Sequence, residues 1–126
     1  MFPIKIKGKA EKVFKLCLKK KIKMSFAESC TGGILSSLIT SFPNSSKIYS
    51  CGYITYSDLS KQNMIGVKSK TLKKYGAVSY EVAKEMVNGV WKKDKLNIAL
   101  SITGIAGPSG QTKKKEGWFS LYWFKK

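Results

Sequence analysis

The chain has 126 residues, of which 43% are hydrophobic and 25% charged, as in one ordinary globular domain. No apolar run is long enough to cross a bilayer, and residues 1–23 lack the features of a secretory signal, so we expect a cytoplasmic protein without a membrane span. The net charge of +17 comes from 24 Lys against seven Asp and Glu. There is no Arg, and the lysines are spread along the chain, which indicates coding bias rather than a nucleic-acid-binding patch.

The first half of the chain alternates between the apolar spacing of helices and the apolar runs of strands. A stretch rich in Tyr, Ile and Thr predicts a buried strand, and Ser57 and Asp58 after it are good helix-capping residues. The expected elements are a helix at 9–20, a strand at 24–27, a tight turn at 28–33, a helix at 33–41, the buried strand at 48–56 and a helix at 57–64.

The second half continues the alternation after a predicted loop that runs through Gly66 and Gly76. Ser79 can cap a longer helix that ends near residues 93–95, with an inward face of Val82, Ala83, Met86, Val87, Val90 and Trp91. Strands are expected at 96–103 and 118–124, separated by a Gly-rich loop at 104–110. The predicted fold is therefore α/β, a single three-layer α/β/α domain over residues 1–126 with a mixed or mostly parallel sheet of about four or more strands.

Ser29 lies in the predicted turn between a strand and a helix. A serine at such a turn projects its hydroxyl into a cleft, and neighbouring backbone N–H groups point to the same place, which suits a nucleophile beside an oxyanion hole. The same local pattern also fits a serine or threonine that only caps the following helix. Cys30 is a second possible nucleophile, although a small cysteine next to a turn is more often a core residue.

The sequence contains no His, so a base for Ser29 must come from another residue type. A lysine whose pKa is lowered by burial can serve, and Lys61 is the candidate, with Tyr56 five residues earlier able to share its pocket. Three cysteines without close pairing indicate neither a disulfide framework nor a zinc site, and no metal is expected. The Gly-rich loop fits a phosphate cradle or a simple turn equally well.

Four sequence blocks, taken together, resemble the CinA C-terminal domain family of nicotinamide-nucleotide amidohydrolases. They are AESCTGG at 27–33, GYITYSD at 52–58 with Lys61, YGAVS at 75–79 and SITGIAGP at 101–108. The resemblance implies hydrolysis of the carboxamide of nicotinamide mononucleotide, with no metal or organic cofactor, and it alone suggests a homodimer.

By matched position, the resemblance implies that Ser29 is the nucleophile, Lys61 its base and Tyr56 a residue that orients or relays the proton. The small-molecule nucleotide substrate is expected to contact the turn and the Gly-rich loop. The residues concerned are Glu28, Cys30, Thr31, Gly32 and Gly33 in the turn and Thr103, Gly104, Ala106, Gly107 and Pro108 in the loop.

The resemblance also implies a further segment with a Gly-Asp-Arg motif and a helix beyond the last strand. The sequence ends at Lys126 without any Arg, so we expect a domain truncated after that strand. An active amidohydrolase is the favoured hypothesis. A folded but inactive member of the family is the alternative, and a basic accessory module for nucleic acid or competence is a weaker one.

Overall fold

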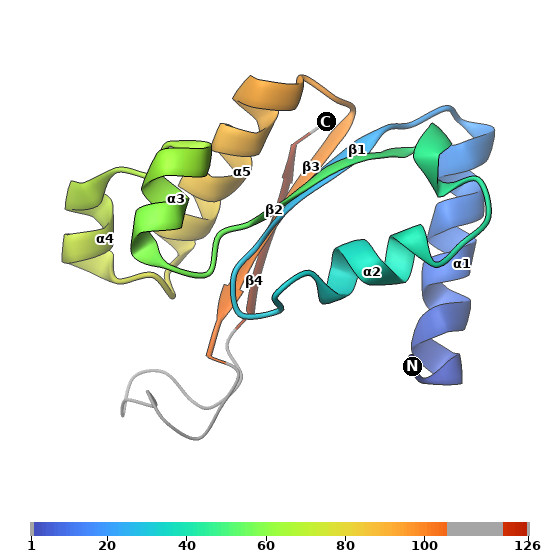
Figure 1. Ribbon diagram of the computed structural model, residues 1–126, viewed down its shortest axis with the longest axis horizontal. Helices are drawn as coiled ribbons and strands as arrows, with labels where there is room; N and C mark the ends of the chain where they lie inside the picture. The colour runs from blue at the N-terminus through green and yellow to red at the C-terminus, as the bar shows by residue number, and fades with distance from the viewer. Residues whose placement is uncertain (1, 106–119, 126) are drawn as a thin grey trace.

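A mixed sheet with the strand order β2-β1-β3-β4 divides the structure into two helical layers (Figure 1). The computed structural model describes residues 2–105 and 120–125. Strands β1 (Met24–Glu28), β2 (Tyr49–Ile54) and β3 (Ile98–Gly104) are parallel, and β4 (Ser120–Lys125) runs antiparallel to β3. This arrangement confirms the predicted α/β class and the mixed sheet.

Each face of the sheet is covered by helices that bury their apolar side against it. Helices α1 (Ile4–Lys19) and α2 (Ile34–Thr40), with the short 3-10 helix η1 (Ser45–Lys47), lie on one face. Helices α3 (Asp58–Ile65), α4 (Ser69–Tyr75) and α5 (Tyr80–Asp94) lie on the other. Among the described residues, no helix combines the length and the apolar character that a membrane span requires.

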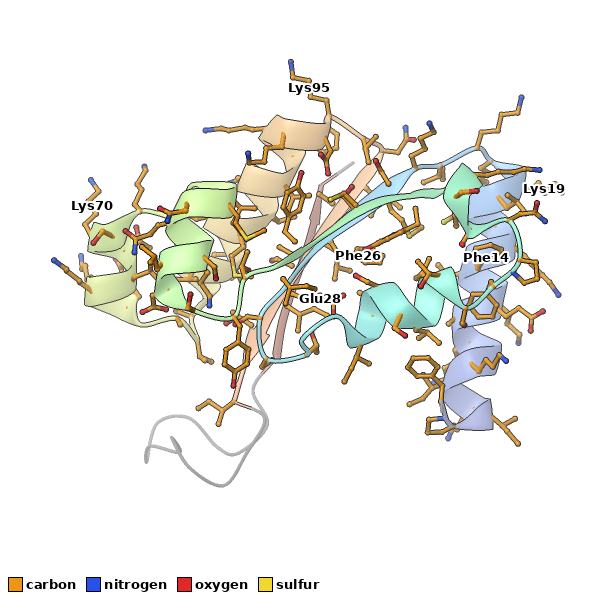
Figure 2. All side chains as sticks on the ribbon, viewed as in Figure 1. Phe14, Lys19, Phe26, Glu28, Lys70 and Lys95 are labelled. Atoms are coloured by element: carbon orange, nitrogen blue, oxygen red, sulfur yellow. The ribbon has the colours of Figure 1, made fainter. Side chains whose placement is uncertain are left out.

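The central strand β1 is buried along its whole length and contributes side chains to the hydrophobic cores on both faces of the sheet. Because successive side chains of a strand point to opposite faces, Met24 and Phe26 pack with α1 and α2, whereas Ala27 packs with α5. Figure 2 shows Phe26 and Phe14 in the layer of α1 and α2. The same alternation directs Glu28 towards α2 and Ser29 towards α3.

The predicted loop between Gly66 and Gly76 was wrong, because residues 69–75 form α4. The start of this helix is held by Glu85 of α5, whose carboxylate accepts hydrogen bonds from the backbone N–H of Lys68 at 2.8 Å and from the hydroxyl of Thr71 at 2.8 Å. A cap supplied by a residue 17 positions away leaves no local signature in the sequence.

Three smaller predictions are also corrected. The first helix begins at Ile4, earlier than predicted, because the Pro3 carbonyl accepts hydrogen bonds from the Ile6 and Lys7 N–H groups and so starts the first turn. The second strand is only half-buried, since β2 is an edge strand paired with β1 alone. On α5, the predicted inward face is buried except for Trp91, which is partly buried.

Candidate active site

Ser29 directly follows β1 and is held in a compact turn. Its N–H donates to the Ile102 carbonyl of β3 at 3.0 Å, and its own carbonyl accepts from the N–H of Gly32 at 3.0 Å. Gly33 has a φ of 101°, a left-handed conformation that strongly favours glycine, and it leads straight into α2. The turn therefore fixes the Ser29 hydroxyl, whose residue is only 6% exposed, on the α3 side of the sheet.

Lys61 lies one turn into α3 and is fully buried, with 0% of its surface exposed. Helix α3 begins with a capping box in which Ser57 and Ser60 satisfy each other's backbone N–H groups, so the position of Lys61 is well defined. Its Nζ lies 3.0 Å from the Ser29 Oγ, 2.9 Å from the Thr55 carbonyl oxygen and 3.1 Å from the Tyr56 carbonyl oxygen. The structure thus brings together the predicted nucleophile and the predicted base.

The environment of Lys61 suits a base. Burial lowers the pKa of the Lys61 ammonium from its ordinary value, and the negative charge of Asp58 opposes this shift. A neutral amine has two N–H donors, which the carbonyls of Thr55 and Tyr56 can accept, and one lone pair that remains for the Ser29 proton. With both N–H groups placed on these carbonyls, the lone pair of a neutral amine can face the Ser29 hydroxyl.

Tyr56 reaches this site through its backbone. Its carbonyl is one of the two oxygens that bind Lys61 Nζ, whereas the residue as a whole is 73% exposed. The role suggested for its phenol, orientation or relay of a proton, stays a prediction. Sequence reasoning missed the neighbouring Thr55, because a backbone carbonyl carries no side-chain signal.

The other turn residues surround Ser29 in different ways. Cys30 is partly buried, and burial raises the pKa of its thiol, which keeps it in the weakly nucleophilic neutral form. Thr31 donates its hydroxyl to the Glu28 carboxylate at 2.8 Å. Glu28 is itself fully buried and accepts from the α2 amides of Leu35 at 3.0 Å and Ser36 at 2.8 Å. The carboxylate is therefore engaged by hydrogen bonds within the protein and is not exposed to a ligand.

Only the first part of the Gly-rich loop falls within the described residues. Thr103 is fully buried, and its hydroxyl donates to the Ala77 carbonyl at 2.8 Å, so this side chain connects β3 to the segment before α5. Gly104 ends β3. The predicted contacts of Ala106, Gly107 and Pro108, and Trp118 of the predicted last strand, lie outside the described residues.

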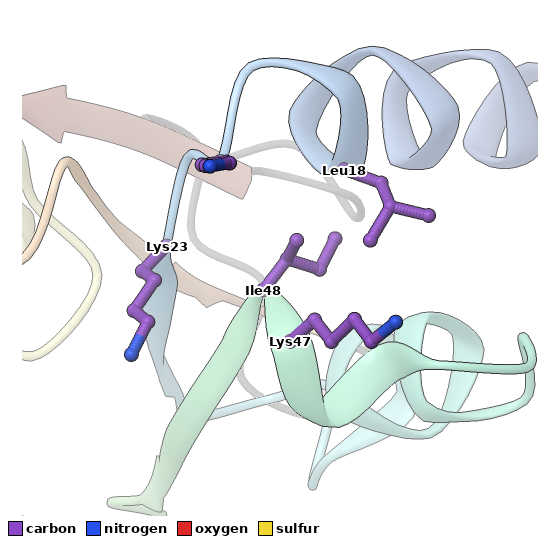
Figure 3. A pocket seen from close by; sticks show the side chains of 5 residues that line it. Leu18, Lys23, Lys47 and Ile48 are labelled. Carbon is purple, nitrogen blue, oxygen red and sulfur yellow. The ribbon is translucent and has the colours of Figure 1, made fainter.

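A separate hollow of about 460 Å³ lies at the opposite end of β1 (Figure 3). It is lined by Leu18, Lys21, Lys23, Lys47 and Ile48. In Figure 3 the Lys23 and Lys47 side chains extend in different directions, and Lys23 precedes β1 whereas Ser29 follows it. This hollow is therefore not part of the serine site.

In the part of the chain that the structure describes, no three His, Cys, Asp or Glu side chains gather as metal ligands would.

The fold and the site together define a three-layer α/β protein in which a strand-to-helix turn presents a serine to a buried lysine. The family model of the CinA C-terminal domain matches residues 6–124, and the chain belongs to this family.

Similar proteins agree with this assignment. The chain is 49% identical over 105 residues to a protein of Alkaliphilus oremlandii named as competence-damage inducible, and 50% identical over 101 residues to a CinA-like protein of Endomicrobium trichonymphae. These matches cover 83% and 80% of this chain but 25% and 24% of those proteins. The chain thus spans about a quarter of the length of these curated relatives.

Solved structures show the same fold. The competence/damage inducible protein CihA from Agrobacterium tumefaciens superposes with a TM-score of 0.88 at 31% identity, over 98% of this chain and 82% of that one. The competence damage-inducible protein A from Klebsiella pneumoniae gives a TM-score of 0.84 at 26% identity, over 94% of this chain and 79% of that one.

Proposed function

We propose that this chain is an amidohydrolase that converts nicotinamide mononucleotide to nicotinic acid mononucleotide and ammonia through a Ser29 nucleophile and a Lys61 base. The observation that carries the proposal is the 3.0 Å separation of Lys61 Nζ and Ser29 Oγ in a buried site of a CinA-family chain. Burial of the lysine supplies the lowered pKa that a base requires.

In the first half of the proposed reaction, neutral Lys61 removes the proton from Ser29 Oγ as this oxygen attacks the carboxamide carbon. The carbonyl oxygen of the substrate becomes an oxyanion, for which the backbone N–H groups of Cys30 and Thr31 are the proposed donors. One preorganised donor of this kind lowers a barrier by roughly 3 kcal/mol. When the tetrahedral intermediate collapses, protonated Lys61 returns its proton to the leaving nitrogen, and ammonia departs.

The second half releases the acid. Lys61, neutral again, removes a proton from a water molecule that attacks the ester carbon of the acyl-enzyme. Collapse of this second intermediate breaks the bond to Ser29 Oγ, which takes the proton back from Lys61. The cycle needs one water molecule, yields one carboxylic acid and one ammonia, and restores the enzyme.

The proposed substrate carries a phosphate group. A net charge of +17 favours the approach of an anionic nucleotide, and the Gly-rich loop after β3 is the proposed phosphate-side contact. Comparison of nicotinamide mononucleotide with its dephosphorylated nucleoside tests this point. A higher kcat/KM for the phosphorylated compound that falls with added salt is the expected result.

The direct test is ammonia release from nicotinamide mononucleotide by the purified protein. Ser29→Ala is expected to lower kcat by about 10³-fold or more, because the covalent route is lost. Ser37→Ala removes an exposed serine hydroxyl on α2 and is the matched control. Equal rates for wild type and Ser29→Ala would rule out the proposed nucleophile.

A further inference from the structure

Glu28 is a buried carboxylate with an unusually complete set of hydrogen-bond donors. One oxygen accepts from the Thr31 hydroxyl at 2.8 Å and the Leu35 N–H at 3.0 Å. The other accepts from the Ser36 N–H at 2.8 Å and the Ser36 hydroxyl at 2.6 Å. Among the described residues, no lysine forms an ion pair with it. Four donors at these distances satisfy both oxygens of the buried carboxylate and compensate for the water it loses on folding.

The carboxylate and its donors span the segment that carries the nucleophile. Glu28 precedes Ser29, Thr31 lies in the middle of the turn, and Leu35 and Ser36 belong to the first turn of α2. A single side chain therefore ties the end of β1, the turn and the helix into one rigid unit. Figure 2 shows Glu28 between β1 and the start of α2.

The alternation of side chains along β1 links the position of Glu28 to the position of the Ser29 hydroxyl. Glu28 points into the α2 layer, whereas Ser29 lies in the α3 layer within 3.0 Å of Lys61 Nζ. A rotation of the turn about the end of β1 would move both side chains together. Holding Glu28 on α2 thus also holds the Ser29 hydroxyl against Lys61.

The network extends to the edge strand β2. Burial raises the pKa of the Tyr49 phenol, which also hydrogen-bonds with Ser36. A Cβ on Gly52 would lie 2.6 Å from the Ser36 hydroxyl and would overlap the Tyr49 oxygen. Glycine at this position leaves the space that the Ser36 hydroxyl needs to reach Glu28.

We propose that Glu28 is a positioning residue of the serine site, which holds the turn of residues 29–33 on α2 and so aligns Ser29 and the turn amides without contacting substrate. This role rests on the proposed function, since it is defined by the reaction of Ser29. It differs from the contact with substrate that the resemblance implied.

The test uses Glu28→Gln, which keeps the shape of the side chain but replaces one acceptor oxygen by a donor NH₂. Two readouts are measured. The first is kcat and KM for nicotinamide mononucleotide, and the second is the rate at which a fluorophosphonate labels Ser29, monitored by mass spectrometry of the intact protein. Both kcat and the labelling rate are expected to fall by about 10- to 100-fold with KM within about threefold, because a small misplacement of a reacting group has this effect. Tyr53→Phe, which removes a partly buried 2.8 Å hydrogen bond to Asp94, is the stability control and should keep both rates.

The outcomes separate the two proposals. A folded Glu28→Gln protein with wild-type kcat and labelling overturns the positioning role, and so does a raised KM with unchanged kcat, which indicates substrate contact. If Glu28→Gln does not fold, Ser36→Ala removes the 2.6 Å bond to Glu28, together with the hydrogen bond between Ser36 and Tyr49, and is expected to lower labelling by about 3- to 10-fold. No change in that variant also overturns the role. Wild type that is labelled at Ser29 but releases no ammonia contradicts the proposed substrate alone.

Discussion

Replacement of Lys61 by Met is the most informative perturbation of the proposed mechanism. Met keeps an unbranched apolar side chain of similar length, so it can fill the space of the lysine stem. It removes the Nζ atom and with it the contacts of 3.0 Å to Ser29 Oγ and of 2.9 and 3.1 Å to the carbonyl oxygens of Thr55 and Tyr56. The variant therefore deletes the base while it leaves Ser29 and the turn amides in place.

We expect Lys61→Met to lower kcat by about 10³-fold, within the range of about 10² to 10⁴ that a general base contributes. The pH dependence carries the sharper prediction. Because burial lowers the Lys61 pKa below its ordinary value of 10.5, wild-type labelling of Ser29 by a fluorophosphonate should rise with pH to a midpoint below 10.5. Lys61→Met should be slower and should lack this rise.

Unfolding gives an independent readout of the same pKa. Between the lowered pKa of folded Lys61 and 10.5, the unfolded chain binds more protons than the folded chain, so wild-type stability increases with pH over this window. Lys61→Met lacks that contribution. The Tm of wild type minus the Tm of Lys61→Met should therefore increase as pH rises from 7 to 10.

The matched control is Lys70→Met, which removes an exposed lysine that projects from α4 (Figure 2). It should keep wild-type kcat, labelling rate and pH profile. The reasoning is refuted if Lys61→Met labels Ser29 at the wild-type rate with the wild-type pH dependence, since Lys61 would then not be the base.

Two further variants test the surroundings of Lys61. Asp58→Asn removes a negative charge that raises the Lys61 pKa, so the rise of Ser29 labelling with pH should shift to lower pH; a shift to higher pH, measured in the same labelling assay, contradicts the assignment. Gly89→Ala places a Cβ against the Ile65 carbonyl oxygen, where α5 packs on the end of α3, and overpacking of this kind costs about 2 kcal/mol or more. Calorimetry should show a Tm lower by about 5 °C or more, and an unchanged Tm would show that the two helices separate freely.

Local sequence patterns were sufficient for most of the fold. The strand and turn around Ser29 were predicted because a buried apolar run and a pair of glycines are signals within a few residues. Helix α4 was missed because its start is held by Glu85, which comes from a different helix. Its seven residues bury only Thr71 and Leu72, too few to produce a clear apolar period.

The two members of the proposed site were determined in different ways. The sequence by itself placed Ser29 at a strand-to-helix turn, since strand, glycine and helix signals are all local. It could not distinguish Lys61 from 23 other lysines by any local property, and only the resemblance to a family selected it. The tertiary structure decided the chemistry of that lysine, because packing of α3 against the sheet buries it completely and brings Nζ within 3.0 Å of Ser29. A lowered pKa requires the removal of water, and only a folded chain can remove it.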